Sequence, residues 1–264
     1  MSMRADLYLT THGYTQSRQR ARVLIEQGCV RIDGVILKKP SQPIEDGTHE
    51  VEIVQNMPYV GRGGLKLKAA LDRFHLDVSG TLALDIGAST GGFTDCLLQS
   101  GAAFVYAVDS GSDQLAKKLL EDPRVASLEH INARTLSLEQ IGGKAVDLIV
   151  MDVSFISATY ILPRFTALLK PNGHAICLIK PQFEVGRAML GKGGVVKDIT
   201  AHRFAIDRVL DSATSLGLTP CGLMPSPIEG GDGNREFLVC LINSRDHTSK
   251  VTEPLIQSVL KEKG

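Results

Sequence analysis

The fold is decided by the stretch Leu82-Ala-Leu-Asp-Ile-Gly-Ala-Ser-Thr-Gly-Gly-Phe-Thr-Asp95, in which an apolar strand runs through three glycines into a helix. A second apolar strand, from Phe104 to Val108, ends on Asp109, twenty-two residues beyond Gly87. This layout is typical of an α/β domain that binds a nucleoside cofactor, because glycines let the backbone approach the ligand and an acid after the second strand accepts from ribose hydroxyls.

The glycine spacing favours S-adenosylmethionine over a dinucleotide. The glycines read G-x-x-x-G-G, and Ser89 stands where the dinucleotide pattern G-x-G-x-x-G needs glycine. We expect Asp85 to point a negative charge into the loop, which would repel a pyrophosphate but not a sulfonium cation. A nicotinamide-dependent dehydrogenase is therefore disfavoured. An ordinary strand–turn–helix corner is the plain alternative, because a lone glycine loop is a weak signal.

The amino-acid composition limits the classes of protein to which this chain can belong. A chain of 264 residues suggests one or two domains, and 29 Lys+Arg balance 29 Asp+Glu, so a nucleic-acid partner must be held by local patches. No apolar signal region or membrane span of about 20 residues is recognisable. The five cysteines lack C-x-x-C spacing and predict buried thiols in a reduced cytoplasmic protein, without a disulfide framework or metal site. They are Cys29, Cys96, Cys177, Cys221 and Cys240.

Residues 1–57 predict a compact α+β module. A short helix over 3–9, a helix over 18–27 with Ser17 as its N-cap, a hairpin over 30–37 turning on Asp33-Gly34 and a strand over 49–53 are expected. Seven basic residues against three acidic ones between positions 4 and 44 suit a phosphate backbone, although a solvated helix face would look similar. The basic residues are Arg4, Arg18, Arg20, Arg22, Arg31, Lys38 and Lys39.

The same module resembles the S4-type RNA-binding domain. The resemblance lies in Arg4-x-Asp-x-x-Leu, Ser17-Arg-x-x-Ala21, Ile25-x-x-Gly28-x-Val30-x-Ile-Asp-Gly34 and Lys39-Pro40. It implies RNA as a partner, but it does not identify the chemistry, because the domain occurs in several enzyme families.

After a linker over 58–64, residues 65–245 predict a mainly parallel sheet with helices on both faces, followed by a tail or short helix over 246–264. Strands are expected at 82–87, 104–109, 127–131, 146–152, 174–180, 218–224 and 236–242. Helices are expected near 65–75, 91–100, 112–121, 158–169 and 200–216.

Charged residues at the strand ends are the catalytic candidates, since ligands of open α/β sheets bind beyond the carboxyl ends of the strands. Asp152 and Lys180 each end a strand, Glu236 begins an antiparallel one, and Lys66 precedes the first strand. Methylation of a ribose 2′-hydroxyl needs such a set, because a lysine can accept the hydroxyl proton while carboxylates orient the lysine and the hydroxyl. Two unrelated surface ion pairs are the alternative.

The chain as a whole, from about residue 3 to 242, resembles the TlyA family, in which an S4-type domain precedes a methyltransferase domain related to FtsJ. The matching stretches are Arg62-Gly-Gly-Leu-Lys66-Leu, Asp85-Ile-Gly-Ala-Ser-Thr-Gly-Gly-Phe-Thr-Asp95, Asp152-Val-Ser-Phe-Ile, Leu178-Ile-Lys180-Pro-Gln-Phe-Glu and Gly233-Asn-Arg-Glu236-Phe. The resemblance implies S-adenosylmethionine-dependent 2′-O-methylation of cytidine in ribosomal RNA, with Lys66, Asp152, Lys180 and Glu236 as the catalytic tetrad. FtsJ itself has Asp-x-x-Pro-Asn where this chain has Asp152-Val-Ser-Phe, so the substrate contacts of this loop are not carried over.

The cofactor and RNA contacts follow from these expectations. Cofactor contacts are expected from Asp85, Gly87, Ser89, Gly91, Phe93, Asp109, Asn132 and Ala133. Further RNA contacts are expected from Arg62, Arg187 and Lys192, the last two in a glycine-rich segment over 181–198 that is either an RNA-clamping lid or a plain loop. Two other functions stay open: a membrane-active haemolysin, a label carried by some TlyA relatives, and a non-catalytic RNA-binding assembly factor.

Overall fold

The computed structural model describes residues 2–26, 28–45, 47–53, 58–231 and 233–262. The chain divides into two compact units, Met1–Arg62 and Gly63–Gly264, and the division falls within the expected linker. Each unit has its own buried apolar cluster. No helix among the described residues is long and apolar enough to cross a membrane.

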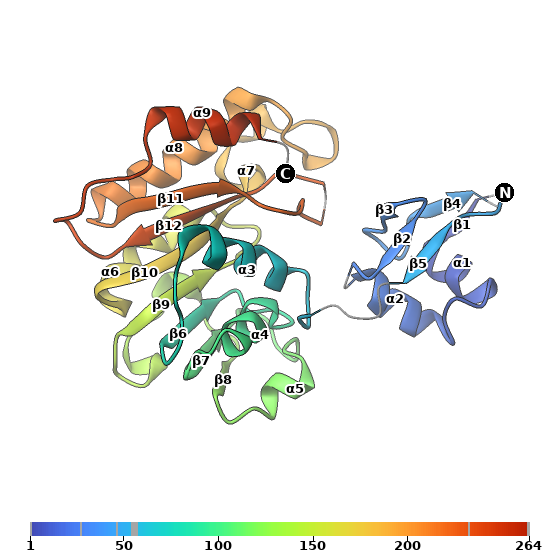
Figure 1. Ribbon diagram of the computed structural model, residues 1–264, viewed down its shortest axis with the longest axis horizontal. Helices are drawn as coiled ribbons and strands as arrows, with labels where there is room; N and C mark the ends of the chain where they lie inside the picture. The colour runs from blue at the N-terminus through green and yellow to red at the C-terminus, as the bar shows by residue number, and fades with distance from the viewer. Residues whose placement is uncertain (1, 27, 46, 54–57, 232, 263–264) are drawn as a thin grey trace. The chain divides into compact units, whose positions relative to one another are not determined.

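The small unit consists of two helices and two small antiparallel sheets (Figure 1). In chain order its elements are β1 (Ser2–Arg4), α1 (Ala5–Thr11), α2 (Arg18–Glu26), β2 (Val30–Ile32), β3 (Val35–Ile36), β4 (Pro43–Glu45) and β5 (Val51–Ile53). Strand β1 pairs with β4, and the second sheet has the order β3-β2-β5. The first and fourth strands were not expected: β1 includes Met3 and Arg4, where the helix over 3–9 was expected to begin, and that helix, α1, starts at Ala5.

Local signals of the small unit act as predicted. The Ser17 hydroxyl accepts from the backbone N–H of Arg20, as an N-cap does. Asp33 and Gly34 both have positive φ, 50° and 76°, and they join β2 to β3 in a two-residue turn that the right-handed twist of the strands favours. Gln27, the expected end of the second helix, lies outside the described residues.

The large unit contains a seven-stranded sheet with the order β11-β12-β10-β9-β6-β7-β8. The strands are β6 (Leu82–Ile86), β7 (Phe104–Val108), β8 (Val125–Leu128), β9 (Val146–Met151), β10 (Leu169–Ile179), β11 (Thr219–Pro225) and β12 (Phe237–Ile242). In this sheet β12 is antiparallel to both of its neighbours, β10 and β11, and the other described strand pairs are parallel. The predicted mainly parallel sheet is therefore confirmed.

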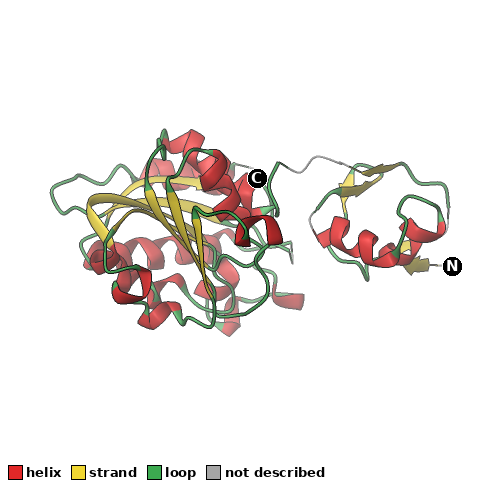
Figure 2. Ribbon diagram, turned by 90° about the horizontal axis from the view of Figure 1, so that it is seen from below, coloured by secondary structure: helices red, strands yellow, loops and turns green. Residues whose placement is uncertain are grey.

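Helices lie on both faces of this sheet (Figure 2). They are α3 (Gly63–Phe74), α4 (Gly92–Gln99), α5 (Lys117–Leu120), α6 (Phe165–Leu168), α7 (Pro181–Glu184), α8 (Ile199–Ser215) and α9 (Glu253–Lys261). Short 3-10 turns are η1 (Ala133–Thr135), η2 (Glu139–Ile141), η3 (Ala158–Tyr160), η4 (Leu162–Arg164), η5 (Arg187–Met189) and η6 (Lys192–Gly194). Helix α3 packs with α4, and α8 packs with α7 and α9.

Two helices differ from the sequence expectation, and a third region is decided between two alternatives. The helix expected over 158–169 is broken into η3, η4 and α6, because Pro163 has no N–H to continue a helix through this point. The helix expected over 112–121 begins only at Lys117, since Asp113 has a positive φ of 56°. Of the tail or short helix expected over 246–264, residues 253–261 form the helix, α9, with Ile256, Val259 and Leu260 buried in the core.

Candidate active site

Four charged side chains of the large unit form one alternating chain, Glu236–Lys66–Asp152–Lys180. The Nζ atom of Lys66 lies 2.6 Å from Oε2 of Glu236 and 3.9 Å from Oδ2 of Asp152. The Nζ atom of Lys180 lies 2.6 Å from Oδ1 of Asp152. Lys66 and Glu236 are 7% and 2% exposed and Asp152 and Lys180 are half-buried, so this is one partly buried network and not two surface ion pairs. Such groups stay charged in a protein interior only when they are paired.

The sheet brings these residues together from distant parts of the chain. Asp152 follows the end of β9, and Lys180 follows the end of the neighbouring parallel strand β10. Because β12 is antiparallel to β10, its first residue Phe237 pairs with Ile179, which puts Glu236 at the same edge as Lys180. Lys66 reaches this edge from the first turns of α3.

Lys180 has a second partner that the sequence did not indicate. Its Nζ donates to Oγ of Ser154 at 2.9 Å, in addition to its ion pair with Asp152. Ser154 stands in the Asp152-Val-Ser-Phe segment that differs from the FtsJ pattern. The position of the Lys180 amine is therefore set from two directions.

A cavity of about 420 Å³ opens beside this ion chain. Among the predicted cofactor residues, Gly87, Ser89, Asp109, Asn132 and Ala133 line it. The wall also includes Asp152, Ser154 and further residues that sequence reasoning missed: Ile86, Val108, Ser110, Gln114, Ile131, Val153, Phe155, Ile156 and Ile161. Most of them follow the carboxyl ends of β6, β7, β8 and β9, where the Gly-rich loop and strand-end acids point.

Gly87 is the position in this wall where only glycine fits. Its φ is +84°, and a Cβ atom there would lie 2.4 Å from the carbonyl oxygen of Asp152. Such a contact would push the Gly-rich loop away from the end of β9. The cavity therefore depends on the close approach of these two strand ends.

The acid after the second strand organises the loop. The Asp109 carboxylate accepts from the backbone N–H groups of Ser89 and Gly111, each at 2.8 Å, and Gln114 accepts from the Ser89 hydroxyl. Since a carboxylate has about four lone-pair sites, these two bonds leave capacity for ribose hydroxyls. Asn132 caps η1 by accepting from the N–H of Arg134.

Three predicted cofactor residues do not line the cavity, and the expectation for Asp85 needs correction. Its carboxyl group does not point a charge into the loop. It is fully buried and accepts from the Thr94 hydroxyl at 2.7 Å, while its Oδ1 has no hydrogen-bond partner. Burial, with a smaller contribution from Asp152, raises its pKa to about 7, although the bonds from Thr94 act in the opposite direction. Gly91, with φ +92°, precedes α4, and Phe93 is buried within α4.

A separate cavity of about 370 Å³ reaches the other end of the ion chain. It is lined by Ser226, Ile228, Glu229, Arg235, Glu236, Lys261 and Glu262. Asp152 thus lines one cavity and Glu236 the other. Because β10 lies between β12 and β9 in the sheet, Lys180 at its end stands between the strand ends that border the two cavities.

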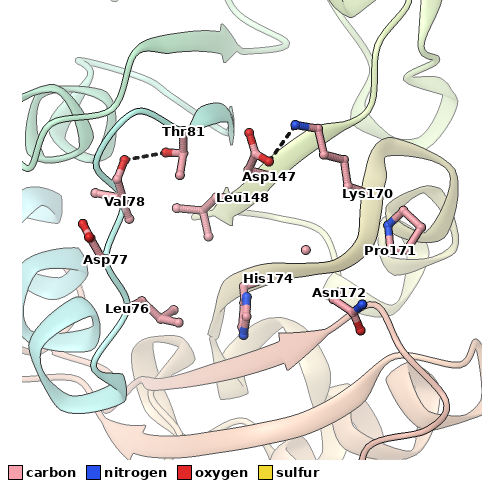
Figure 3. A pocket seen from close by; sticks show the side chains of 11 residues that line it. Leu76, Asp77, Val78, Thr81, Asp147, Leu148, Lys170, Pro171, Asn172 and His174 are labelled. Atoms are coloured by element: carbon pink, nitrogen blue, oxygen red, sulfur yellow. Dashed lines mark hydrogen bonds and ion pairs between the residues drawn. The ribbon is translucent and has the colours of Figure 1, made fainter.

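A third cavity, of about 230 Å³, lies at the opposite edge of the sheet, where β9 begins (Figure 3). Here Lys170 pairs with Asp147 at 2.7 Å, the same type of pair on the same two strands as Lys180 with Asp152. The His174 ring lines this cavity, and its pKa is lowered by burial and by His247 and Lys250. Two similar lysine–aspartate pairs thus lie at the two ends of strands β9 and β10. Of the two, the Lys180–Asp152 pair belongs to the ion chain.

The basic residues of the small unit are mostly exposed, but two of them also hold the fold. Arg4 and Arg18 both contact the buried carboxylate of Asp6, at 3.0 Å each, and these bonds lower the pKa of Asp6 to about 2. Arg20, Arg22, Arg31 and Lys39 are exposed and Lys38 is half-buried; Arg31 lies 3.7 Å from Glu52.

The other expected RNA contacts lie elsewhere in the chain. Arg187 is exposed in η5, and Arg62 is half-buried directly before α3. The side chain of Lys192 lies outside the described part of the structure. The 181–198 segment contains the short elements α7, η5 and η6, joined by irregular stretches.

Comparison with known proteins agrees with this arrangement. A family model described as FtsJ-like methyltransferase matches residues 59–243, and one described as S4 domain matches residues 3–49. A relative from Mycobacterium tuberculosis named 16S/23S rRNA (cytidine-2'-O)-methyltransferase TlyA is 41% identical over 262 residues, 98% of this chain and 97% of that protein. A relative from Brachyspira hyodysenteriae named Hemolysin A is 42% identical over 240 residues, 91% of this chain and 100% of that protein. A solved structure from Streptococcus thermophilus that carries the name hemolysin has a TM-score of 0.78 and 38% identity, and the match covers 98% of this chain and 94% of that one.

Proposed function

This chain belongs to the TlyA family, in which an S4 domain precedes an FtsJ-like methyltransferase domain, and from that premise we propose that it methylates the 2′-hydroxyl of a cytidine ribose in ribosomal RNA. The observation that carries the proposal is the partly buried chain Glu236–Lys66–Asp152–Lys180 beside the cavity at the strand ends. A domain that only bound a cofactor would not need these four groups.

We propose S-adenosylmethionine as the methyl donor. The residues suit it, because Gly87 and Ser89 border the cavity, Asp109 can accept from ribose hydroxyls, and Asn132 and Ala133 border the same cavity. When bound, this cofactor supplies a methyl group on a positively charged sulfur.

In this mechanism Lys180 first releases one proton to solvent, and its neutral amine then accepts the proton of the ribose hydroxyl. A neutral amine has two N–H groups and one lone pair. Asp152 and Ser154 can accept from the two N–H groups, and the lone pair is left to accept the hydroxyl proton. Lys66 balances the charge of Asp152 and Glu236 and keeps Asp152 oriented toward Lys180. Correct orientation of the hydroxyl supplies much of the acceleration.

RNA is the proposed partner of the small unit. The exposed basic residues there, Arg20, Arg22 and Lys39 among them, can neutralise backbone phosphates, which holds RNA without reading its sequence. A ribosomal RNA substrate would also have the protein work in the cytoplasm.

The test is methyl transfer from labelled S-adenosylmethionine to ribosomal subunits and to free ribosomal RNA, for the wild type, Lys180→Ala and Lys170→Ala. Lys170 is a matched control, since it is a lysine on the same strand paired with an aspartate at the opposite edge. We expect label at an alkali-resistant cytidine with the wild type and Lys170→Ala. With Lys180→Ala the rate should fall by a factor of at least about 100, as for loss of a general base. Cofactor binding without transfer to any RNA would instead support the assembly-factor reading.

The hemolysin names of two similar proteins favour one second candidate, lysis of membranes. The same Lys180→Ala protein separates the two functions, because lysis does not need a methyl-transfer base. Red cells lysed equally by the wild type and by Lys180→Ala would support the second candidate.

A further inference from the structure

Glu184 is a buried carboxylate that the mechanism above does not use. It is the last residue of α7 and is 1% exposed. Its Oε1 accepts from the backbone N–H of Ala158 at 2.7 Å, and its Oε2 accepts from the Ser157 hydroxyl at 2.5 Å. Burying a carboxylate costs free energy, and burial raises the pKa of this one, so the two short bonds must offset that cost.

These bonds close a loop that belongs to the active site. Residues 153–157 connect Asp152, at the end of β9, to η3. Four of the five line the large cavity: Val153, Ser154, Phe155 and Ile156. The loop is held near its start by Lys180, which contacts Asp152 and Ser154, and at its end by Glu184. Both clamps come from the single segment 180–184.

That segment is itself anchored. Pro181 opens α7 directly after Lys180, and the Arg208 guanidinium of α8 donates to the carbonyl oxygen of Glu184 at 2.6 Å. Helix α8 spans 17 residues and packs against the sheet. The clamp therefore connects the cavity wall to a long helix of the core.

We propose that Glu184 is a positioning residue for methyl transfer. It fixes the 153–157 loop against the 180–184 segment, so that the Lys180 amine and one wall of the cofactor cavity keep a single mutual geometry. It acts through Ser157 and Ala158 and does not itself line the cavity. The inference rests on the proposed function for its kinetic consequence. Its structural consequence, the shape of the cavity wall, is measurable without any RNA.

The test compares Glu184→Ala, Glu184→Gln and Ser157→Ala with the wild type. A shift of about 1 Å in a positioned group can cost about 100-fold in rate, so we expect kcat of Glu184→Ala to fall by about that factor with KM for ribosomal RNA unchanged. Glu184→Gln keeps the size and one acceptor, so it should recover part of the loss. Ser157→Ala removes one of the same bonds, so its effect should not add to that of Glu184→Gln. Affinity for S-adenosylhomocysteine, measured by calorimetry, should fall in Glu184→Ala as well.

Glu253→Gln is the matched control, because it removes a carboxylate that pairs with Arg203 at 2.6 Å far along the chain from this loop. It should leave kcat and cofactor affinity unchanged. Each variant is assayed at a temperature below its own unfolding transition. If Glu184→Ala does not fold, Ser157→Ala carries the test alone, since it removes only one bond.

Two results would overturn the inference: wild-type kcat and wild-type cofactor affinity in folded Glu184→Ala, or additive losses in the Ser157→Ala, Glu184→Gln double variant. If the wild-type protein binds S-adenosylhomocysteine but methylates no RNA, the proposed function is contradicted instead. In that case weaker cofactor binding by Glu184→Ala would still support the clamp.

Discussion

Asp85 shows how one residue of a sequence motif acts through burial. It stands in the stretch that decides the fold, yet its carboxyl group lies behind the Gly-rich loop with Thr94 as its donor. Burial raises its pKa from the ordinary 3.8 to about 7. In the folded protein this group therefore holds its proton over a range of pH in which the unfolded chain has released it.

We expect this residue to make the protein less stable as pH rises from about 4 to about 7. Over that window the folded state binds more protons than the unfolded state, so the free energy of unfolding falls, by about 1.4 kcal/mol for each unit by which the pKa is raised. Above the folded-state pKa the loss levels off. The Asp85→Asn side chain has no proton to release and can still accept from Thr94. The free energy of unfolding of this variant, relative to that of the wild type, should therefore increase as pH rises over this window.

The measurement is urea unfolding of both proteins at pH 5 and pH 8. The difference in free energy of unfolding between the two proteins is compared at the two pH values. The contributions of the other titrating groups are common to both proteins and cancel in this difference. A difference that stays the same at the two pH values would show that Asp85 does not titrate in this window.

At the scale of elements, the C-terminal helix α9 is tied to the active-site strand by one arginine. The Arg235 guanidinium donates to the carbonyl oxygens of Leu260 at 2.7 Å and Val259 at 2.5 Å, and also to that of Glu262. It lies 5.0 Å from the ring centroid of Phe237. Arg235 thus satisfies carbonyl groups that the end of a helix leaves open, and it sits directly before Glu236.

Arg235→Ala should lower the free energy of unfolding by about 1.5–3 kcal/mol, the usual worth of hydrogen bonds from a charged group. We also expect residues 253–262 to become more sensitive to proteases, because α9 would then be held by its apolar face and, at its first residue, by the Arg203–Glu253 ion pair. Denaturant unfolding and limited proteolysis measure the two effects. Arg73→Ala, which alters an exposed arginine of α3, is the control. Equal proteolysis of both variants would contradict this anchoring role.

At the scale of the whole molecule, the two units divide the proposed work: the small unit holds RNA and the large unit transfers the methyl group. Neutralising Arg20 and Arg22 together should weaken binding to ribosomal RNA and reduce the slope of log affinity against log salt by up to about 2, since each phosphate contact contributes somewhat less than 1. Cofactor affinity should not change. Arg4 and Arg18 are unsuitable for this test, because they also hold the buried Asp6.

The control for this prediction carries the same change in net charge. Lys68→Ala with Lys117→Ala removes two exposed lysines of the large unit, each in an ion pair within its own helix turn. Binding isotherms at several salt concentrations compare the two double variants. An equal loss of affinity in both would argue that net charge matters and that the small unit holds no RNA.

Much of this architecture could be predicted from the sequence, because strands and turns follow local patterns. Apolar runs that end on Asp109, Asp152 and Lys180 marked the ends of strands, and Asp33-Gly34 marked a hairpin turn. The strand-end positions singled out four charged residues, the family resemblance implied the same four, and the structure brings them together. The prediction of one helix over 158–169 was wrong, because it followed the spacing of the apolar residues, which takes no account of the single proline in the segment.

By itself, then, the sequence determined the order of elements, the class of fold and the strand-end residues, since these depend on neighbours within a few positions. Only the tertiary structure decided which distant groups meet: Lys66 and Glu236 are 170 positions apart, and the antiparallel place of β12 beside β10 joins them. It also decided that Asp85 turns inward and that Glu184 clamps the 153–157 loop. The physical reason is that burial and partner choice depend on packing between segments, which no local pattern contains.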